Sequence, residues 1–512
     1  MTRLRKTLAD ERRRCAQRLH ALLVQEGWAC ARGRLLTGQG RRWVAGLGLH
    51  PGARAYADVA LAVIAAAEAQ LEPLESDLRR FARSDRRCRT LMQIYGVGEL
   101  IACHLLAEIG EAVRLRRPRQ LVRAAGLDPV VDESAERRRR GRLAKQGSPR
   151  PALDVMGGAS GRDRFAASST RIDEGGPSKM VYAAIDIHKR IFQAAVLDAE
   201  SGELVQERLP AMREALNDWA TRWEGKLEAV ALEATTGWRW VWRELSSHGF
   251  EVRLCDPGQA RALRGSKRRP KTDRLDAAWL ARLLAKEMLP TSWLPPEDIQ
   301  YLRDRTRLRR ALAQDRMRFA QRLHALLTHE GWPCSRGGLL SISGQRWARS
   351  LALPPAARAN VEAMFVLIAV LDEQLAVIDA ELRQRARSDP RLKALCTIFG
   401  VGPVLAAHLL AEIGQANRFR RARQVVRAAG LDPVVSESAE TRRRGKLSKQ
   451  GSPELRWALV EAAHHACQRR SPDHSLYLAG KERSGSKRAA LTVARKIARR
   501  AHHVLAELEQ AA

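Results

Sequence analysis

Four acidic residues between positions 186 and 276 have a spacing that suits metal-dependent phosphodiester chemistry. Asp186 ends an apolar run in AIDIHK, and Glu233 ends another in LEATTG. Asp273 and Asp276 follow in KTDRLDAAW, three residues apart, so a helix would place them on one face. Carboxylates that converge from different chain segments can hold Mg²⁺, which polarises a phosphate and activates a nucleophile. The pattern therefore predicts a magnesium site that acts on nucleic acid.

Each acid taken singly also has an ordinary structural explanation. Asp273 could cap a helix, Glu233 could be a surface charge, and Asp186 could belong to a turn. The combination is more specific, because Asp186 and Glu233 interrupt apolar strands, where an unpaired carboxylate is costly without a metal or a cation. Cations in RGSKRRPK precede the aspartate pair and suit a phosphate backbone. The basic residues expected to bind nucleic acid are Lys189, Lys267, Arg268, Arg269, Lys271, Arg442, Arg443, Arg444 and Lys449.

The segment that carries these acids alternates between strand and helix patterns. MVYAAIDIHKR and IFQAAVLDAESGELVQERL are β-branched and alternating, with a Ser-Gly turn that separates two runs. LEAVALEA is a further buried strand, GWRWVWRELSSHG a helix, and FEVRLCDP a strand that ends at proline. The order β-β-β-α-β-α-β-α predicts an RNase H-like, or RuvC-like, α/β fold, whose strand order the sequence does not specify.

The residues after this segment predict a mostly helical structure. Apolar residues recur at helical spacing from 298 to about 327 and again from 361 to 382, which predicts a long antiparallel helical pair. Ordinary bundle helices would give the same pattern. Gly400 and Gly402, in GVGP before an apolar helix, are typical of a helix-hairpin-helix turn that binds a DNA phosphate through backbone N–H groups. A purely structural turn with proline at the first helical position is the alternative.

The chain also repeats itself. AQRLHALLVQEGW at 16–28 returns as AQRLHALLTHEGW at 320–332, and VRAAGLDPVV and KQGSP return with the same offset of 304 residues. The first repeat, residues 1–149, thus aligns with residues 305–453 and has no counterpart of residues 180–296. Residues 150–179 are rich in Gly, Ser and Arg and predict a linker. The first repeat is either a dispensable remnant before an ancestral start at Met180 or a mimic of a neighbouring subunit.

Composition supports a nucleic-acid partner and excludes several protein classes. Lys and Arg outnumber Asp and Glu by 90 to 57 among 512 residues, which gives a formal charge of +33. Eight cysteines occur without a CxxC pair, so neither a zinc ribbon nor a redox motif is predicted. No apolar run is long enough to cross a bilayer, and the first residues predict an amphipathic helix. We expect no membrane partner and a cytoplasmic, nucleoid-associated location.

The motifs that carry this chemistry occur together in one order. They are DIHK, EATTGW, KTDRLDA, GVGP…AEIG, GLDP…S and LSKQGSPELRWAL. In this combination the chain resembles the DEDD transposases of bacterial insertion sequences, from about Met180 to the C-terminus. The resemblance implies a RuvC-like domain, a serine-containing transposase domain, a structured bridge RNA as guide, and a homo-oligomer, either dimer or tetramer. The first repeat resembles a second, partial copy of the same protein.

The resemblance also implies specific catalytic residues. The acidic tetrad corresponds to Asp186, Glu233, Asp273 and Asp276, which would hold Mg²⁺. The serine nucleophile corresponds to Ser438, in GLDPVVSESAETRRRGKLSKQG. The residue after it departs from the family pattern, which leaves Ser436 as a second candidate.

Within the chain, Ser438 is matched by Ser134 of the first repeat, whereas Ser436 is matched by Asp132. This comparison favours Ser438. A turn or capping hydroxyl remains the ordinary explanation of a serine at this place.

The expected activity is DNA cutting and rejoining by an insertion-sequence transposase. A metal-dependent nuclease that only hydrolyses DNA, or a decayed element that only binds nucleic acid, are the alternatives. The expected domains are a partial duplicate of the helical pair and transposase domain at 1–149, a linker at 150–179, a RuvC-like domain at 180–296, a helical pair at 297–390, and a transposase domain at 391–512.

Overall fold

The computed structural model describes most of the chain. The described residues are 1–28, 30–31, 33–111, 117–125, 129–134, 137–143, 180–263, 273–335, 337–438 and 441–511. The predicted linker and four predicted nucleic-acid-binding residues, Lys267, Arg268, Arg269 and Lys271, lie outside them. No helix among the described residues is both long and apolar enough to cross a bilayer.

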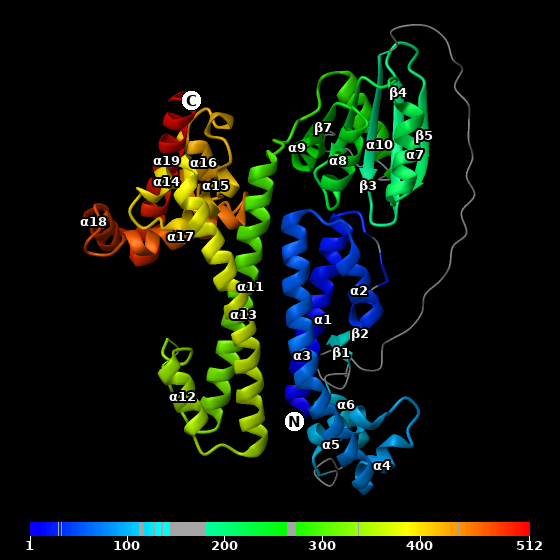
Figure 1. Cartoon of the computed structure of the whole chain (residues 1–512), viewed down its shortest axis with the longest axis vertical. Coiled ribbons are helices and arrows are strands. Elements are labelled where there is room, and N and C mark those ends of the chain that lie inside the picture. Colours follow the sequence, from blue (N-terminus) through cyan, green and yellow to red (C-terminus); the bar gives the residue numbers. More distant parts are fainter. Residues whose placement is uncertain are drawn as a thin grey trace. The chain divides into compact units, whose positions relative to one another are not determined.

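A five-stranded mixed sheet forms the centre of residues 180–291 (Figure 1). Three antiparallel strands, β5 (Leu204–Pro210), β4 (Ile191–Asp198) and β3 (Val181–Ile187), lie side by side in this order. Two parallel strands, β6 (Ala229–Glu233) and β7 (Val252–Cys255), continue the sheet beyond β3. The predicted succession of three strands followed by helix–strand units is therefore confirmed.

Helices cover both faces of this sheet because the strands alternate between two apolar cores. On one face α7 (Arg213–Trp223) and α8 (Trp238–Ser247) pack over large side chains such as Phe192 and Leu232. On the other face α10 (Asp273–Ala285) packs over small ones, including Ala184 and Ala231. Small side chains on this second face let α10 approach the strands closely. A short helix, α9 (Pro257–Leu263), follows β7.

The predicted long helical pair is present as α11 (Glu297–His329) and α13 (Pro355–Ser388), with α12 (Ile342–Ser350) between them (Figure 1). Arg309 Nε donates to Asp379 Oδ1 over 2.7 Å, and Arg316 Nη2 donates to Asp372 Oδ2 over 3.2 Å. The predicted apolar stripe is buried along most of its length. Near its end Leu327 is fully buried and Leu326 only half-buried, because the buried stripe advances from Leu323 by four residues.

The first repeat forms the same helical pair from α1 (Thr2–Gln25) and α3 (Pro51–Ser84), with η1 (Arg34–Leu36) and α2 (Gly38–Gly46) between them. Arg5 pairs with Glu75 at 2.9 Å and Arg12 with Glu68 at 3.5 Å. These are the positions equivalent to the two ion pairs of α11 and α13. Repeated sequence therefore builds repeated structure. The repeat continues through α4 (Arg86–Met92), α5 (Glu99–Ile109), α6 (Pro118–Ala124), β1 (Pro129–Ser134) and β2 (Arg137–Leu143).

The C-terminal residues form a helical bundle with one hairpin. A buried apolar helix, α15, lies against α14 and α17, and the long helix α19 contacts α14, α16, α17 and α18. The elements are α14 (Pro390–Cys396), α15 (Pro403–Ile413), η3 (Ala416–Arg418), α16 (Ala422–Ala428), β8 (Pro433–Ser438), β9 (Thr441–Leu447), α17 (Pro453–Ala466), α18 (His474–Ser484) and α19 (Ser486–Ala511).

Three basic residues of α19 have a structural role that the sequence did not reveal. Lys496 Nζ lies 2.8 Å from Asp473 Oδ1, and Arg500 Nη2 donates to the same oxygen over 3.1 Å. Asp473 is fully buried, so it needs these cations. Arg495 donates to the carbonyl oxygen of Leu431 over 2.8 Å. The basic face of α19 is therefore neither a simple solvated face nor wholly available to nucleic acid.

His408 of α15 is a titratable group buried inside the bundle. Burial, and then the charges of Arg309 and Arg310, lower its pKa to about 3. The unfolded chain would bind a proton near pH 6.5 that the folded chain binds only near pH 3, so stability should fall as pH drops below about 6.5. We expect the free energy of unfolding to fall by up to about 1.4 kcal/mol per pH unit from this group. Urea unfolding at pH 7 and pH 5 should show a smaller loss in His408→Met than in the unmodified chain, and an equal loss would contradict the assignment.

Candidate active site

Asp186 and Glu233 lie at the C-terminal ends of neighbouring parallel strands, at the same level of the sheet. The register of β3 and β6 pairs Ile185 with Leu232, so the next residue on each strand is Asp186 or Glu233. Ala184 and Ala231, two residues earlier, belong to the core under α10. Because side chains alternate along a strand, both acids lie on the face of the sheet that α10 covers.

The other two acids of the tetrad belong to α10 itself. Asp273 is its first residue, and Asp276 lies in its first turn, directly before the buried Ala277 that packs on β3 and β6. Asp276 is half-buried, and the side chain of Asp273 lies outside the described residues. The fold thus places three described carboxylates on β3, on β6 and on the helix that covers their common face. Among the described side chains, no three His, Cys, Asp or Glu groups lie so that together they could hold a metal ion.

The edge of the sheet at which Asp186 and Glu233 lie, called the acidic edge below, is buried and negatively charged. Asp186 is only 5% exposed, and its Oδ2 lies 3.2 Å from Nε2 of the half-exposed His188. Burial, followed by the charges of Glu233 and Asp256, raises the pKa of the Cys255 thiol to about 12. This thiol therefore stays protonated at neutral pH and is a poor nucleophile. Oxygen ligands with a dense negative charge are what Mg²⁺ prefers, so the donor set fits that ion.

Asp256 is an acid at this edge that sequence reasoning missed. It directly follows β7, the third parallel strand, whose Cys255 pairs with Glu233. Its Oδ1 accepts a hydrogen bond from the Gln259 backbone N–H over 2.9 Å, which caps the start of α9. The signal was present in FEVRLCDP, where an acid follows a strand just as Asp186 and Glu233 end theirs.

The candidate serines lie on the β8–β9 hairpin. The register pairs Ser438 with Thr441 at its tip and Ser436 with Arg443. The side chains of both serines and of Arg442, Arg443 and Arg444 lie outside the described residues. The first repeat has the same hairpin, where Ser134 pairs with Arg137.

Residues of two motifs, GLDP and LSKQGSP, hold the base of the β8–β9 hairpin together through hydrogen bonds. Ser448 Oγ donates to Asp432 Oδ1 over 2.7 Å, and the Lys449 N–H donates to the carbonyl oxygen of Gly430 over 3.1 Å. The N–H of Ser452 donates to the Ala428 carbonyl oxygen over 2.7 Å. Lys449 is exposed and has a positive φ of 52°, which is uncommon without glycine. The two motifs therefore position the serine hairpin on the bundle.

Glu412 connects this base to the long helical pair. It is 8% exposed and accepts hydrogen bonds from Arg307 Nη2 over 2.9 Å and from Ser452 Oγ over 2.8 Å. Removal of this carboxylate would leave both donors without their acceptor. We therefore expect Glu412→Ala to lower the free energy of unfolding by about 2 kcal/mol in urea titrations.

A matched control for Glu412 is the exposed pair of Arg349 and Glu362, 3.1 Å apart. Glu362→Ala should change stability by less than about 0.5 kcal/mol, because exposed ion pairs contribute little. Equal effects of the two substitutions would show that Glu412 does not fasten the hairpin base.

The two glycines of GVGP have different surroundings. Gly400 has φ of +88°, and a Cβ there would lie 2.5 Å from the Ala462 carbonyl oxygen of α17. Close packing therefore explains this glycine. Gly402 caps α15, is exposed, and would have no described atom within 4 Å of an added Cβ. Pro403 occupies the first helical position, as the structural alternative predicted.

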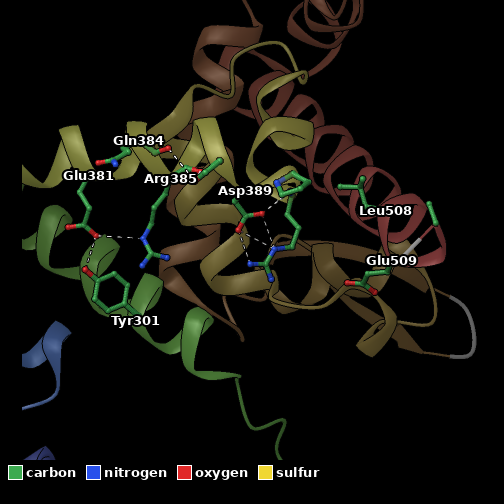
Figure 2. Close-up of a pocket in the computed structure, with 11 residues that line it drawn as sticks. Tyr301, Glu381, Gln384, Arg385, Asp389, Leu508 and Glu509 are labelled. Carbon is green, nitrogen blue, oxygen red and sulfur yellow. Dashed lines mark hydrogen bonds and ion pairs between the residues drawn. The ribbon is translucent and has the colours of Figure 1, made fainter.

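A surface pocket of about 960 Å³ lies elsewhere, between α11, the α13–α14 junction and the end of α19 (Figure 2). The acidic residues that line this pocket already accept hydrogen bonds from neighbouring side chains or backbone N–H groups. Tyr301 donates to Glu381 over 2.9 Å, and Arg391 Nη2 donates to Asp389 over 2.8 Å. No residue of the predicted site lines it, so this pocket is not a candidate for the chemistry.

Comparison with known proteins identifies the parts of the chain. A DEDD transposase model matches residues 183–330, and a model described as Transposase IS116/IS110/IS902 family matches residues 88–154 and 392–479. Together the matches span more than half of the chain.

Two transposases that align with this chain over most of their own length agree with these matches. A probable family 20 transposase of Pseudomonas aeruginosa is 24% identical over 62% of this chain and 94% of the relative. The transposase for insertion sequence element IS1111A of Coxiella burnetii is 23% identical over 61% of this chain and 86% of the relative. The DEDD transposase model covers the mixed five-stranded sheet and also the long helix α11. The chain belongs to the IS116/IS110/IS902 family of insertion-sequence transposases and is a DNA transposase.

Proposed function

We propose that this transposase cuts and rejoins DNA with Mg²⁺ held by Asp186, Glu233, Asp273 and Asp276 and with Ser438 as the nucleophile. The observation that carries the proposal is the common level of Asp186 and Glu233 on adjacent strands, on the face that α10 covers. The DEDD transposase match to residues 183–330 contains all four positions and supports an RNase H-like fold.

The proposed reaction is an exchange of phosphodiester bonds. Magnesium at the tetrad would offset charge that develops on the scissile phosphate. The Ser438 Oγ attacks phosphorus, so that an Oγ–P bond forms, the P–O3′ bond breaks, and the serine proton passes to the departing 3′ oxygen. Attack by another 3′ hydroxyl on the phosphoserine reverses these steps and rejoins the strands. The covalent link conserves bond energy, which hydrolysis would lose.

Cations near the serine hairpin suit the same reaction. Arg443 is opposite Ser436 in the register, Arg442 and Arg444 flank it, and Lys449 lies exposed at the hairpin base. Positive charge there would stabilise the phosphate oxygens as charge accumulates. Exposed Lys189, beside the acidic edge, and the N-terminus of α15 at Gly402 would contact the DNA backbone.

The proposed tetrad and serine belong to different parts of the chain. We place them in a RuvC-like domain at 180–296 and a transposase domain at 391–512, joined by the helical pair at 297–390. One active site must therefore be assembled from two domains, either of one chain or of two. We propose that DNA is the substrate, that a structured RNA guides its choice, and that assembly involves a dimer or a tetramer.

The experiment that tests this function incubates the full chain with a supercoiled plasmid that carries an element end, with and without Mg²⁺. We expect covalent protein–DNA complexes and rejoined products that require the metal. Cleavage with free ends but no covalent complex would favour a hydrolytic nuclease. Binding without any cleavage, at every metal concentration, would favour a decayed element that only binds nucleic acid.

A further inference from the structure

Two ion pairs connect α1 of the first repeat with α11 of the second. Arg18 Nη1 lies 2.6 Å from Asp315 Oδ2, and Arg322 Nη1 lies 3.7 Å from Glu11 Oε2. With the offset of 304, Arg18 is equivalent to Arg322, and Glu11 is equivalent to Asp315. The same contact is therefore made twice with the roles of the repeats exchanged. This reciprocity is the property of a two-fold interface between like surfaces.

The acids of these reciprocal pairs are buried, which distinguishes them from chance surface contacts. The side chain of Glu11 is 1% exposed and that of Asp315 is 5% exposed. Each also pairs with an arginine three residues later on its own helix, Arg14 for Glu11 and Arg318 for Asp315. A buried carboxylate is costly unless cations accompany it, so the arginine from the other repeat is part of what keeps each acid inside.

The tip that follows α1 makes a second, independent contact. Arg213 of α7 donates to the Glu26 carbonyl oxygen over 2.7 Å, and its guanidinium lies 5.3 Å from the ring centres of both Trp28 and Trp240. Arg243 Nη1 lies 3.6 Å from Glu26 Oε2. The Glu26–Trp28 tip thus packs on the α7–α8 surface, which we define by Arg213, Trp240 and Arg243. A Cβ on Gly27 would lie 2.7 Å from the Trp240 ring, which shows how closely the tip packs.

The second repeat carries the same tip, Glu330–Trp332, and among the described residues the surroundings of this tip are open. A Cβ on Gly331 would meet no described atom within 4 Å, and Trp332 is 37% exposed. The reason lies in the sequence, because the first repeat has no counterpart of residues 180–296 and so offers no α7–α8 surface in return. A two-fold pair that lacks one of its two sheet domains would show this difference. It would have two equal tips, but only one of them would have an α7–α8 surface on which to pack.

We propose that the first repeat occupies, within one chain, the place of a second copy of this transposase. Its helix α1 covers the face of α11 that a second chain would contact, and its Glu-Gly-Trp tip fills the α7–α8 surface that the tip of a second chain would fill. The chain is then a single-chain pseudo-dimer with one sheet domain. Its own Glu330–Trp332 tip fits the α7–α8 surface of another chain, which opens only when the first tip leaves.

Site-specific photo-crosslinking of the full chain tests this proposal. The photoreactive amino acid p-benzoylphenylalanine replaces Trp28 in one variant and the equivalent Trp332 in a matched variant. We expect the first to link to residues 213–243 in a band of single-chain mass, and the second to give no such link in that band. The proposal is overturned if Trp28 links to residues 213–243 only in a band of double mass, if it gives no link there, or if Trp332 links there equally within one chain.

A second experiment breaks the contact between α1 and α11 of the same chain by reversing the charges of its ion pairs. In the Trp332 crosslinking variant, Glu11→Arg with Arg18→Glu should raise the double-mass band linked to residues 213–243 by about tenfold, because breaking a buried ion pair costs more than the 1.4 kcal/mol that tenfold requires. Adding Asp315→Arg and Arg322→Glu restores opposite charges and should return the band to its starting level. Circular dichroism shows that each variant is folded. An unchanged double-mass band in folded variants would contradict the proposal.

Discussion

Glu233→Gln is expected to reduce Mg²⁺-dependent cleavage of an element end by about a hundredfold or more, and Asp186→Asn by as much. Both substitutions keep the size of the side chain and remove one negative charge from the acidic edge. Asp186 is 5% exposed, so a change in shape there would also disturb packing, which the amide avoids. Single-turnover cleavage rates measure the effect.

Asp198→Asn is the matched control for these two substitutions. Asp198 ends β4, and its Oδ1 accepts the N–H groups of Glu200 and Ser201 in a turn over 2.9 and 3.1 Å. It is an acid of the same sheet with a local structural role, so its replacement should change cleavage by less than about threefold. A Glu233→Gln variant that cleaves as fast as Asp198→Asn would remove Glu233 from the site.

Ser438→Ala is expected to abolish the covalent protein–DNA complex and strand rejoining, with a loss of about a thousandfold or more. The reason is that alanine offers no oxygen to form the bond to phosphorus. Gel separation of protein–DNA complexes and of rejoined strands measures both products. Continued cleavage by this variant would mean that water, and not the serine, attacks the phosphate.

Two other serines serve as controls for Ser438. Ser436→Ala tests the neighbouring candidate on β8, and Ser134→Ala tests the equivalent serine of the first repeat, which has no acidic tetrad of its own. Both variants should rejoin DNA at the rate of the unmodified chain. Loss of the covalent complex in Ser436→Ala alone would transfer the nucleophile to that residue.

Local sequence patterns predicted the elements of the sheet but not their register. Alternation along residues 181–210 and the apolar run before Glu233 were sufficient to predict four strands and to place two acids at strand ends. That Asp186 and Glu233 lie level depends on how β3 pairs with β6, which joins residues about fifty positions apart. No local pattern contains that pairing.

Tertiary contacts also explain what the sequence left open elsewhere. Lys496 and Arg500 pair with the buried Asp473, a partner that lies more than twenty residues away along the chain and that only packing brings to them. Trp28 and Trp332 lie in nearly identical sequences, yet the Arg213 guanidinium lies over the ring of Trp28 whereas Trp332 is 37% exposed. Nearly identical local sequences cannot predict different surroundings, because the difference comes from distant parts of the chain.

Iron-directed cleavage of the polypeptide tests most directly whether the four acids converge on one metal. Fe²⁺ replaces Mg²⁺ in the full chain, and ascorbate with peroxide then generates radicals that cut the backbone beside the bound ion. We predict cuts near residues 186, 233 and 273–276 together, which excess Mg²⁺ suppresses and Glu233→Gln removes. Cuts at only one of these segments, or at none of them, would contradict a shared metal site.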